Sequence, residues 1–291
     1  MAKVVSFVNY KGGVGKTTLA VEISAALAYH YNKRILLIDA DPQTNATFYL
    51  MDEKTWENYA KNKKTMKELF DAALNDQSFD IRNIIVSSGL EIHLRTRNLH
   101  IIPSHLDLHS IDLDIASRIG KEALKARTIL RRSIEPIKDD YDYIIIDCPP
   151  NMYFITQNAI VASDSVVIVV LPEYLATIGI SLIHRVIDKL NQDIRKQVEA
   201  FGGQFEGAKV KGIIFNRVRR GAYGILVDQR RSIDDVRSQW PDITFKNYVS
   251  ETVRFPERTR MKIPISVSGY AADLRYEEEI KRVAEEFLRR V

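Results

Sequence analysis

Residues 3–18 read KVVSFVNYKGGVGKTT, an apolar run followed by a glycine-rich segment and the start of a helical pattern. Val4 to Val8 is short and rich in β-branched residues, which is typical of a buried strand. From Thr17 to Tyr29 the apolar residues Leu19, Ile23 and Leu27 fall on one stripe, which predicts an amphipathic helix. The segment therefore predicts a strand, a loop and a helix that begin an α/β fold.

The same alternation continues along the chain and predicts a mostly parallel, twisted sheet flanked by helices on both faces. Helical patterns recur at Ile178 to Ile194 and at Glu277 to Val291, and the last of these should dock on the sheet. Leu90, Ile92 and Leu94 alternate with polar residues, which predicts a half-exposed hairpin strand at the sheet edge. The predicted strands are Val4 to Val8, Ile35 to Ile38, Leu99 to Ile102, Tyr143 to Ile146, Val166 to Leu171 and Val210 to Phe215.

The amino-acid composition excludes several classes of protein. Of the 291 residues 45% are apolar and 27% are charged, which excludes an intrinsically disordered chain. Cys148 is the single cysteine, so the chain can form neither an internal disulfide nor a cysteine-cluster metal site. The longest apolar run, Val166 to Leu171, is far shorter than the roughly 20 residues that cross a bilayer. A cytoplasmic protein is expected.

No repeat, low-complexity tract or long linker divides the sequence, so residues 1–291 are expected to form a single domain. The first predicted strand starts close to Met1. We therefore expect no N-terminal helix-turn-helix domain.

The excess of positive charge is concentrated in one stretch of the sequence. The formal net charge is +4, but residues 211–262 hold twelve basic and six acidic residues, whereas the remainder holds 30 basic and 32 acidic residues. A local excess of this kind favours a polyanionic partner for that stretch.

The glycine-rich loop between the first strand and the first helix is typical of polyphosphate binding. Glycines let backbone N–H groups turn towards phosphate oxygens, and the helix N-terminus adds its unpaired donors. Lys16 is placed to reach the β- and γ-phosphates, and the Thr17 hydroxyl to reach Mg²⁺, so ATP and Mg²⁺ are the expected cofactors. The residues expected to bind the nucleotide are Lys11, Gly12, Gly13, Val14, Gly15, Lys16, Thr17 and Thr18.

Residues 11–18, KGGVGKTT, resemble the deviant Walker A motif of the ParA/MinD ATPases. Residues 36–47, LLIDADPQTNAT, resemble the switch segment of ParA proteins, and residues 141–150, YDYIIIDCPP, resemble their Walker B strand. The resemblance covers most of the chain from Lys3 to about Asn216. It implies a P-loop NTPase of the deviant Walker A type in which Lys11 reaches the phosphates of a partner across an ATP-dependent homodimer, much as an arginine finger does. Without that context, a loop lysine is usually a solvated charge.

Three aspartates follow predicted strands and are candidates for the chemistry of hydrolysis. By the resemblance, Asp41 activates the attacking water and Asp39 supports the Mg²⁺ shell or its ligands, with Asn45 as a further contact. Asp147 should hold Mg²⁺ through water. The alternative for Asp39 or Asp41 is a helix N-cap, a common role for aspartate after a strand.

Other residues carry weaker signals. Asn216 ends a predicted strand and either contacts the adenine edge, as the resemblance implies, or forms a turn. Cys148 is expected to be a small buried residue. Four histidines, His93, His100, His105 and His109, lie close in sequence, but without a metal-binding pattern a surface or core-edge role is favoured.

Arginines in two C-terminal segments predict contacts with DNA phosphates that do not read sequence. The resemblance implies that such arginines form the DNA surface of the ATP dimer, and Arg254 matches best. A solvated loop surface with some ion pairs is the alternative. The candidates are Arg219, Arg220, Arg254, Arg258 and Arg260.

The function that the resemblance implies is partition. ATP drives dimerisation, the dimer binds double-stranded DNA on the nucleoid, and a ParB-like partner triggers hydrolysis, so that plasmid, chromosome or other cargo is segregated or positioned. The alternative is a MinD-like membrane-associated ATPase, which needs a basic amphipathic C-terminal helix. The acidic residues between Glu277 and Glu286 disfavour that alternative, so no membrane partner is expected. A metal-cluster carrier or a DNA-binding regulator without cargo is a third hypothesis.

Overall fold

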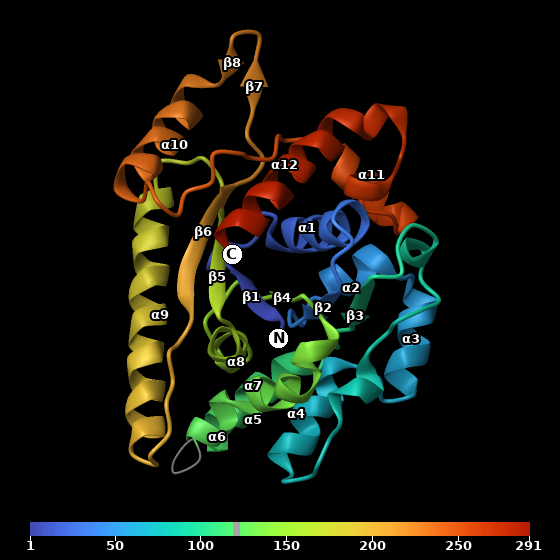
Figure 1. Cartoon of the computed structure of the whole chain (residues 1–291), viewed down its shortest axis with the longest axis vertical. Coiled ribbons are helices and arrows are strands. Elements are labelled where there is room, and N and C mark those ends of the chain that lie inside the picture. Colours follow the sequence, from blue (N-terminus) through green and yellow to red (C-terminus); the bar gives the residue numbers. More distant parts are fainter. Residues whose placement is uncertain (119–122) are drawn as a thin grey trace.

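The computed structural model describes residues 1–118 and 123–291, in which six parallel strands form one sheet in the order β3-β2-β4-β1-β5-β6 (Figure 1). All six predicted strands are present, and the predicted α/β fold is confirmed. The strands are β1 (Lys3–Val8), β2 (Ile35–Asp39), β3 (Leu99–Ile102), β4 (Tyr143–Asp147), β5 (Ser165–Val170) and β6 (Lys209–Phe215). A separate small hairpin pairs β7 (Arg220–Gly221) with β8 (Gly224–Ile225).

Helices cover both faces of the sheet. Alternate residues of β1 belong to different cores: Val4 and Val8 pack with α4, α5, α7, α8 and α9, whereas Val5 and Phe7 pack with α1 and α12. Figure 1 shows α1 and α12 on the opposite side of the sheet from α7 and α8. The helices are α1 (Lys16–His30), α2 (Asn45–Leu50), α3 (Glu53–Lys61), α4 (Met66–Leu74), α5 (Leu108–Arg118), α6 (Ala123–Arg127), α7 (Ile129–Ile134), α8 (Phe154–Ala162), α9 (Ala176–Glu199), α10 (Val227–Gln239), α11 (Arg254–Met261) and α12 (Leu274–Arg290).

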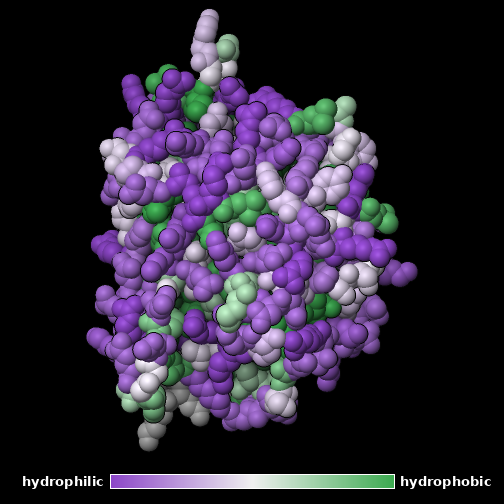
Figure 2. Space-filling view, viewed as in Figure 1, coloured by the Kyte–Doolittle hydropathy of each residue, from purple (hydrophilic) through white to green (hydrophobic). Residues whose placement is uncertain are grey.

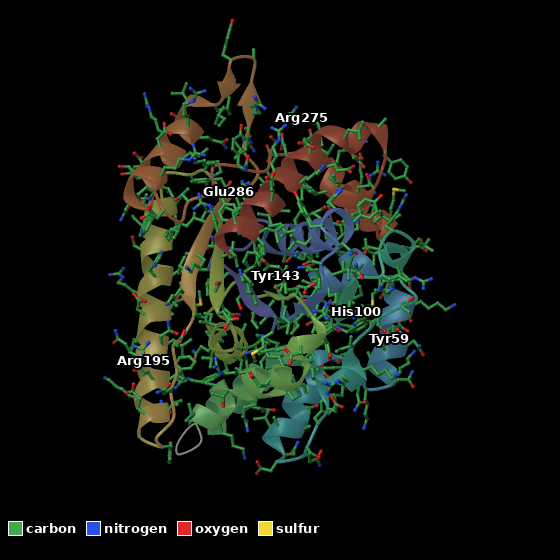
Figure 3. The ribbon with its side chains drawn as sticks, in the orientation of Figure 1. Tyr59, His100, Tyr143, Arg195, Arg275 and Glu286 are labelled. Atoms are coloured by element: carbon green, nitrogen blue, oxygen red, sulfur yellow. The ribbon has the colours of Figure 1, made fainter. Side chains whose placement is uncertain are left out.

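The C-terminal helix α12 docks on the sheet, as its apolar stripe predicts. Ile280, Val283 and Phe287 are fully buried, and the Phe287 ring centroid lies 5.7 Å from that of Tyr143. Near the end of the helix, the Glu286 carboxylate accepts hydrogen bonds from the backbone N–H groups of Lys246 and Asn247 (Figure 3). Both the apolar and the polar side of α12 are therefore engaged within the chain.

The predicted hairpin strand at residues 90–94 is wrong. The segment forms a 3₁₀ turn, Glu91–Leu94, in which the His93 ring accepts a hydrogen bond from the Leu90 N–H at 3.1 Å and contacts the Leu99 carbonyl at 3.0 Å. Leu90 and Ile92 are buried, but Leu94 is exposed. An alternation of three apolar residues is too short to distinguish a strand from one helical turn that a side chain closes.

A buried carboxylate on α1 ties the first helix to two distant segments. Glu22 is fully buried and accepts hydrogen bonds from the Tyr49 hydroxyl at 2.6 Å and from the N–H groups of Ile265 and Ser266, both at 2.9 Å. Burial raises the pKa of Glu22, and the donated hydrogen bonds oppose that shift. The network joins α1, α2 and the segment after α11.

We expect Glu22→Gln to lower the free energy of unfolding by about 1–3 kcal/mol, because both oxygens of the carboxyl group accept hydrogen bonds and the amide nitrogen that replaces one of them cannot. A carboxyl group whose pKa is raised on folding contributes stability below its ordinary pKa of 4.5, and this contribution is lost as the pH rises through the folded value. Urea unfolding should therefore show the largest deficit of the variant near or below pH 4.5. A deficit that grows towards pH 8 would contradict the assignment.

Among the described residues, no helix has the length and apolar content that a membrane span requires. On the face shown in Figure 2, hydrophilic side chains predominate and apolar ones form small separate groups.

Candidate nucleotide site

The candidate site lies at the carboxyl ends of the parallel strands, where open α/β sheets bind ligands. The glycine-rich loop follows β1 and leads directly into α1. Gly15 has a φ of 85°, and a Cβ there would lie 2.0 Å from the Asn216 amide nitrogen, so only glycine fits between the loop and β6. Asn216 Nδ2 donates to the Val14 carbonyl at 2.9 Å. The loop is therefore fixed from the β6 side.

A cleft of about 600 Å³ opens above this loop. One wall comes from the loop and the segment after β2, and the opposite wall comes from the residues after β6 and from α11. The lining residues are Gly12, Gly13, Gly15, Lys16, Thr17, Thr18, Asp41, Gln43, Asn45, Tyr49, Pro150, Asn216, Arg217, Glu251, Thr252, Phe255, Pro256 and Thr259.

Lys16 brings a cation to the floor of the cleft. The residue is only 6% exposed, and burial lowers its pKa, while the carboxylates of Asp147 and Asp41 oppose that shift. A buried ammonium group with no ion pair of its own among the described residues is suited to bind phosphate oxygens.

Asp147 offers the oxygens that a divalent cation prefers. It pairs with Phe7 on β1 and with Asp39 on β2 in the sheet register. Both carboxylate oxygens are buried and have no hydrogen-bond partner among the described residues. Burial and the charge of Asp39 raise the pKa of Asp147, and the nearby Thr17 side chain and Lys16 act against this. An orphaned carboxylate beside a threonine hydroxyl fits a Mg²⁺ site.

Asp39 has a different environment. Its oxygens accept hydrogen bonds from the Asp41 N–H at 3.2 Å and from the Thr47 N–H and hydroxyl, both at 2.7 Å. Thr47 lies in the first turn of α2, so Asp39 binds a backbone N–H of that helix from outside it, whereas the N-cap residue of α2 is Thr44 and not Asp39. Burial and the charge of Asp41 raise the pKa of Asp39 to about 7. Asp39 thus holds α2 beside the site, and three hydrogen bonds engage its two carboxylate oxygens.

Asp41 points into the cleft from an anchored backbone. The Ser104 hydroxyl donates to the Asp41 carbonyl at 2.6 Å, and the Gln43 N–H donates to one carboxylate oxygen at 2.9 Å. Burial raises the pKa of Asp41, while Lys16 lowers it. The carboxylate is therefore fixed at the cleft wall opposite α11, where a water molecule and a terminal phosphate would meet.

Asn216 has a role that the sequence did not predict. Besides holding the loop through Nδ2, Asn216 is one of the residues that line the cleft, and its Oδ1 atom is buried without a hydrogen-bond partner among the described residues. The next residue, Arg217, donates to the Gly13 carbonyl at 3.2 Å and to Glu251 at 3.1 Å. Arg217 and Glu251 thus close the cleft on the β6 side.

Seven residues of the cleft wall were not predicted as site residues from the sequence: Tyr49, Arg217, Glu251, Thr252, Phe255, Pro256 and Thr259. Arg217 could have been found, since it follows Asn216 at the end of a strand. The segment 251–259 gives no such signal, because its place beside the loop depends on the packing of α11 against α2. Lys11 is not among the lining residues, and its ammonium group contacts Glu173 instead.

The candidate DNA arginines do not form one uniform group. Arg220 and Arg260 are exposed, and the Arg254 side chain is 37% exposed with an ion pair to Glu257. Arg219 is 60% exposed and donates to Glu251 at 2.6 Å. The hairpin that carries Arg220 projects from the molecule (Figure 1).

The prediction that Arg258 contacts DNA is wrong. Its guanidinium group is 9% exposed, pairs with the fully buried Asp273 at 2.5 Å and lies 4.1 Å from the centroid of the Tyr270 ring. A buried arginine with these partners holds α11 against the start of α12. It is therefore removed from the candidate DNA surface.

Three of the four histidines, His93, His100 and His105, contact other side chains or backbone groups of the fold, and the cysteine is buried. His93 closes a turn, the His100 ring meets the Tyr141 hydroxyl at 2.9 Å, and His105 packs on Trp56. Cys148 is fully buried, and burial raises the pKa of its thiol.

Comparison with known proteins shows the family. A family model described as an AAA domain matches residues 2–200. The sporulation initiation inhibitor protein Soj of Bacillus subtilis strain 168 is 33% identical over 266 residues, covering 91% of this chain and 90% of Soj. The chain belongs to the ParA/Soj family of ATPases.

Another relative and a solved structure agree with this family assignment. The chromosome partitioning protein ParA of Myxococcus xanthus is 30% identical over 270 residues, which cover 91% of this chain and 81% of that protein. The structure is similar to that of a McdA variant from Cyanothece in complex with ATP, with a TM-score of 0.70, 22% identity and coverage of 99% and 96% of the two chains. Membership of the ParA/Soj family confirms the resemblance drawn from the glycine-rich loop and identifies the chain as a P-loop NTPase.

Proposed function

We propose that this ParA/Soj family member, as a single domain spanning residues 1–291, is an ATP-dependent switch that dimerises, binds DNA without sequence preference and thereby positions a cargo. A ParB-like partner on the cargo would stimulate hydrolysis and release. The observation that carries the proposal is the composition of the cleft: the nucleotide wall includes Phe255 and Thr259 of α11, the helix that begins at Arg254. Nucleotide occupancy can therefore act on a segment that presents arginines to DNA.

The site is suited to slow phosphoanhydride hydrolysis. Lys16 and the loop amides would hold the β- and γ-phosphates, while Thr17 and Asp147 would hold Mg²⁺, the latter through water. When bound, Mg²⁺ neutralises charge on the phosphates. Asp41 would orient the attacking water and accept its proton, because it is the cleft carboxylate with a raised pKa and a fixed backbone.

The DNA surface would comprise Arg219, Arg220, Arg254 and Arg260. These side chains lie on the hairpin and on α11, within the part of the sequence that holds the positive charge. Dimerisation would double the number of arginines and strengthen binding to phosphates. The relative named chromosome partitioning protein ParA supports the positioning of a cargo. A homodimer, a nucleoid location in the cytoplasm and a ParB-like partner are further parts of this proposal.

Arg254→Ala should weaken binding of random duplex DNA in the ATP state while leaving dimerisation unchanged. Each phosphate contact contributes about 0.9 to the slope of log affinity against log salt, so the loss of one contact per subunit should lower the slope of a dimer by about 2. Fluorescence anisotropy over a salt series measures this slope. Arg34→Ala is the matched control, because Arg34 is an exposed, ion-paired arginine just before β2, at the amino ends of the strands and so at the opposite end of the sheet from the cleft. An unchanged slope for Arg254→Ala would remove this residue from the surface.

The membrane-associated alternative predicts that the chain floats with anionic liposomes in ATP. The structure disfavours it, because Ile280, Val283 and Phe287 of α12 are buried against the sheet and leave no apolar face for lipid. Exposed glutamates of α12 form ion pairs with arginines one helical turn later in the sequence: Glu278 with Arg282, and Glu285 with Arg289. We expect no flotation.

A further inference from the structure

Lys11 forms an ion pair within its own chain. Its Nζ atom lies 2.5 Å from Oε2 of Glu173, and the two side chains are 58% and 49% exposed. The proposed function requires this same lysine to reach the phosphates of a second subunit. The pair must therefore break when the dimer forms.

The backbone on both sides of the pair is fixed. The Lys11 N–H donates to Asn9 Oδ1 at 2.9 Å, and Asn9 Nδ2 donates to the Val169 carbonyl of β5 at 2.6 Å. On the other side, the Glu173 N–H donates to the Leu171 carbonyl at 2.8 Å, and the Glu173 carbonyl accepts from the Ala176 N–H at 3.0 Å. Lys11 and Glu173 are thus held at neighbouring positions just beyond β1 and β5, and need only side-chain rotation to meet.

The pair directs Lys11 away from its own nucleotide. Of the two lysines of the loop, Lys16 is buried and lines the cleft, whereas Lys11 is not a lining residue and lies against Glu173. The loop therefore separates its two lysines: one serves the phosphates in the same chain, and the other is stored on a surface carboxylate.

We propose that Glu173 is a positioning residue that stores Lys11 in the single chain and thereby opposes dimerisation until a second subunit offers its ATP phosphates in exchange. This inference rests on the proposed function, since it assigns a role to Glu173 in the dimerisation step. A carboxylate carries one negative charge, whereas the phosphates of ATP offer several, so phosphate can displace it. Glu173 therefore raises the protein concentration at which the ATP-bound dimer forms.

The size of the effect follows from the exposure of the pair. An exposed ion pair contributes about 0.2–1 kcal/mol, which corresponds to a factor of about 1.4–5 in an equilibrium constant. Each dimer breaks two such pairs. Removing the carboxylate should therefore lower the dimer dissociation constant by about 2- to 25-fold.

The test uses Glu173→Gln in the full chain with a non-hydrolysable ATP analogue and Mg²⁺, and measures the dimer dissociation constant by analytical ultracentrifugation. Glu173→Asp, which keeps the carboxylate, should lie between the wild type and Glu173→Gln. Glu199→Gln, an exposed glutamate at the far end of α9, is the matched control and should leave dimerisation unchanged.

A second measurement reports the pair itself. Amine labelling of the nucleotide-free protein, read at Lys11 by mass spectrometry, should be faster in Glu173→Gln than in the wild type, because the lysine has lost its partner. A role of Glu173 in folding alone would not change labelling at Lys11 selectively.

The outcomes distinguish the inference about Glu173 from the proposed function. If the wild type dimerises and Glu173→Gln dimerises more tightly with faster labelling, the inference stands. If the wild type dimerises and the variant shows equal or weaker dimerisation, Glu173 does not oppose assembly and the inference is overturned while the proposed function stands. If the wild type remains a monomer with the analogue at all concentrations, both are overturned.

Discussion

Replacing Lys16 with alanine should lower the affinity for ATP by about 10²- to 10⁴-fold. The side chain is positioned for two charge-assisted hydrogen bonds to phosphate oxygens, and each is worth about 1.5–3 kcal/mol. Removal also leaves Asp41 and Asp147 without the cation that offsets their charges, so the cleft would repel a polyphosphate. Isothermal titration calorimetry with ATP and Mg²⁺ measures the loss.

The matched control is Lys61→Ala, since Lys61 is a 76% exposed lysine paired with Glu57 on α3. This variant should bind ATP as the wild type does. Lys16→Ala should remain folded by circular dichroism, because the Lys16 side chain makes no hydrogen bond or ion pair among the described residues. Retention of ATP affinity within threefold of the wild type would show that nucleotide does not bind above this loop.

Replacing Asp41 with alanine should slow ATP hydrolysis by about 10²–10⁴-fold and leave ATP binding nearly intact, so that an ATP-bound dimer accumulates. The expected loss is the usual contribution of a positioned general base. Asp41 can be removed with little structural cost because its carboxylate accepts one hydrogen bond, from the Gln43 N–H, while its backbone is held separately by Ser104. Phosphate release in single-turnover assays measures the rate.

Asp39→Ala provides the comparison for Asp41→Ala. Asp39 holds both Thr47 and the Asp41 N–H, so its removal should loosen α2 and lower the melting temperature as well as the rate. Asp41→Ala should change the rate with little change in melting temperature. Hydrolysis by Asp41→Ala at the wild-type rate would assign water activation to another residue.

Much of the fold could be predicted from the sequence because its signals are local. The six apolar runs are rich in β-branched residues and bounded by turn residues, and the helix after the glycine-rich loop follows from its stripe of Leu19, Ile23 and Leu27. The exception, residues 90–94, is decided by a side chain, His93, that closes a turn. A pattern of residue types does not contain that contact.

The site was predictable where function requires special residues close together in sequence, as in residues 11–18. It was not predictable where packing decides the environment. Asp39 and Asp147 both end strands and pair in the register of β2 with β4, yet Asp39 accepts three hydrogen bonds, two of them from Thr47 on α2, whereas both oxygens of Asp147 are orphaned. Arg258 is one of several arginines in its segment, and only the position of Asp273 shows that it is buried.

The central claim is that ATP converts this chain into a form that binds DNA through phosphates. The most direct test compares the binding of random duplex DNA to the Asp41→Ala variant in ATP and in ADP, over a series of salt concentrations. We expect tight binding in ATP and weak binding in ADP. In ATP the logarithm of the affinity should fall linearly with the logarithm of the salt concentration. Equal affinity in the two nucleotides, or binding that does not respond to salt, would contradict it.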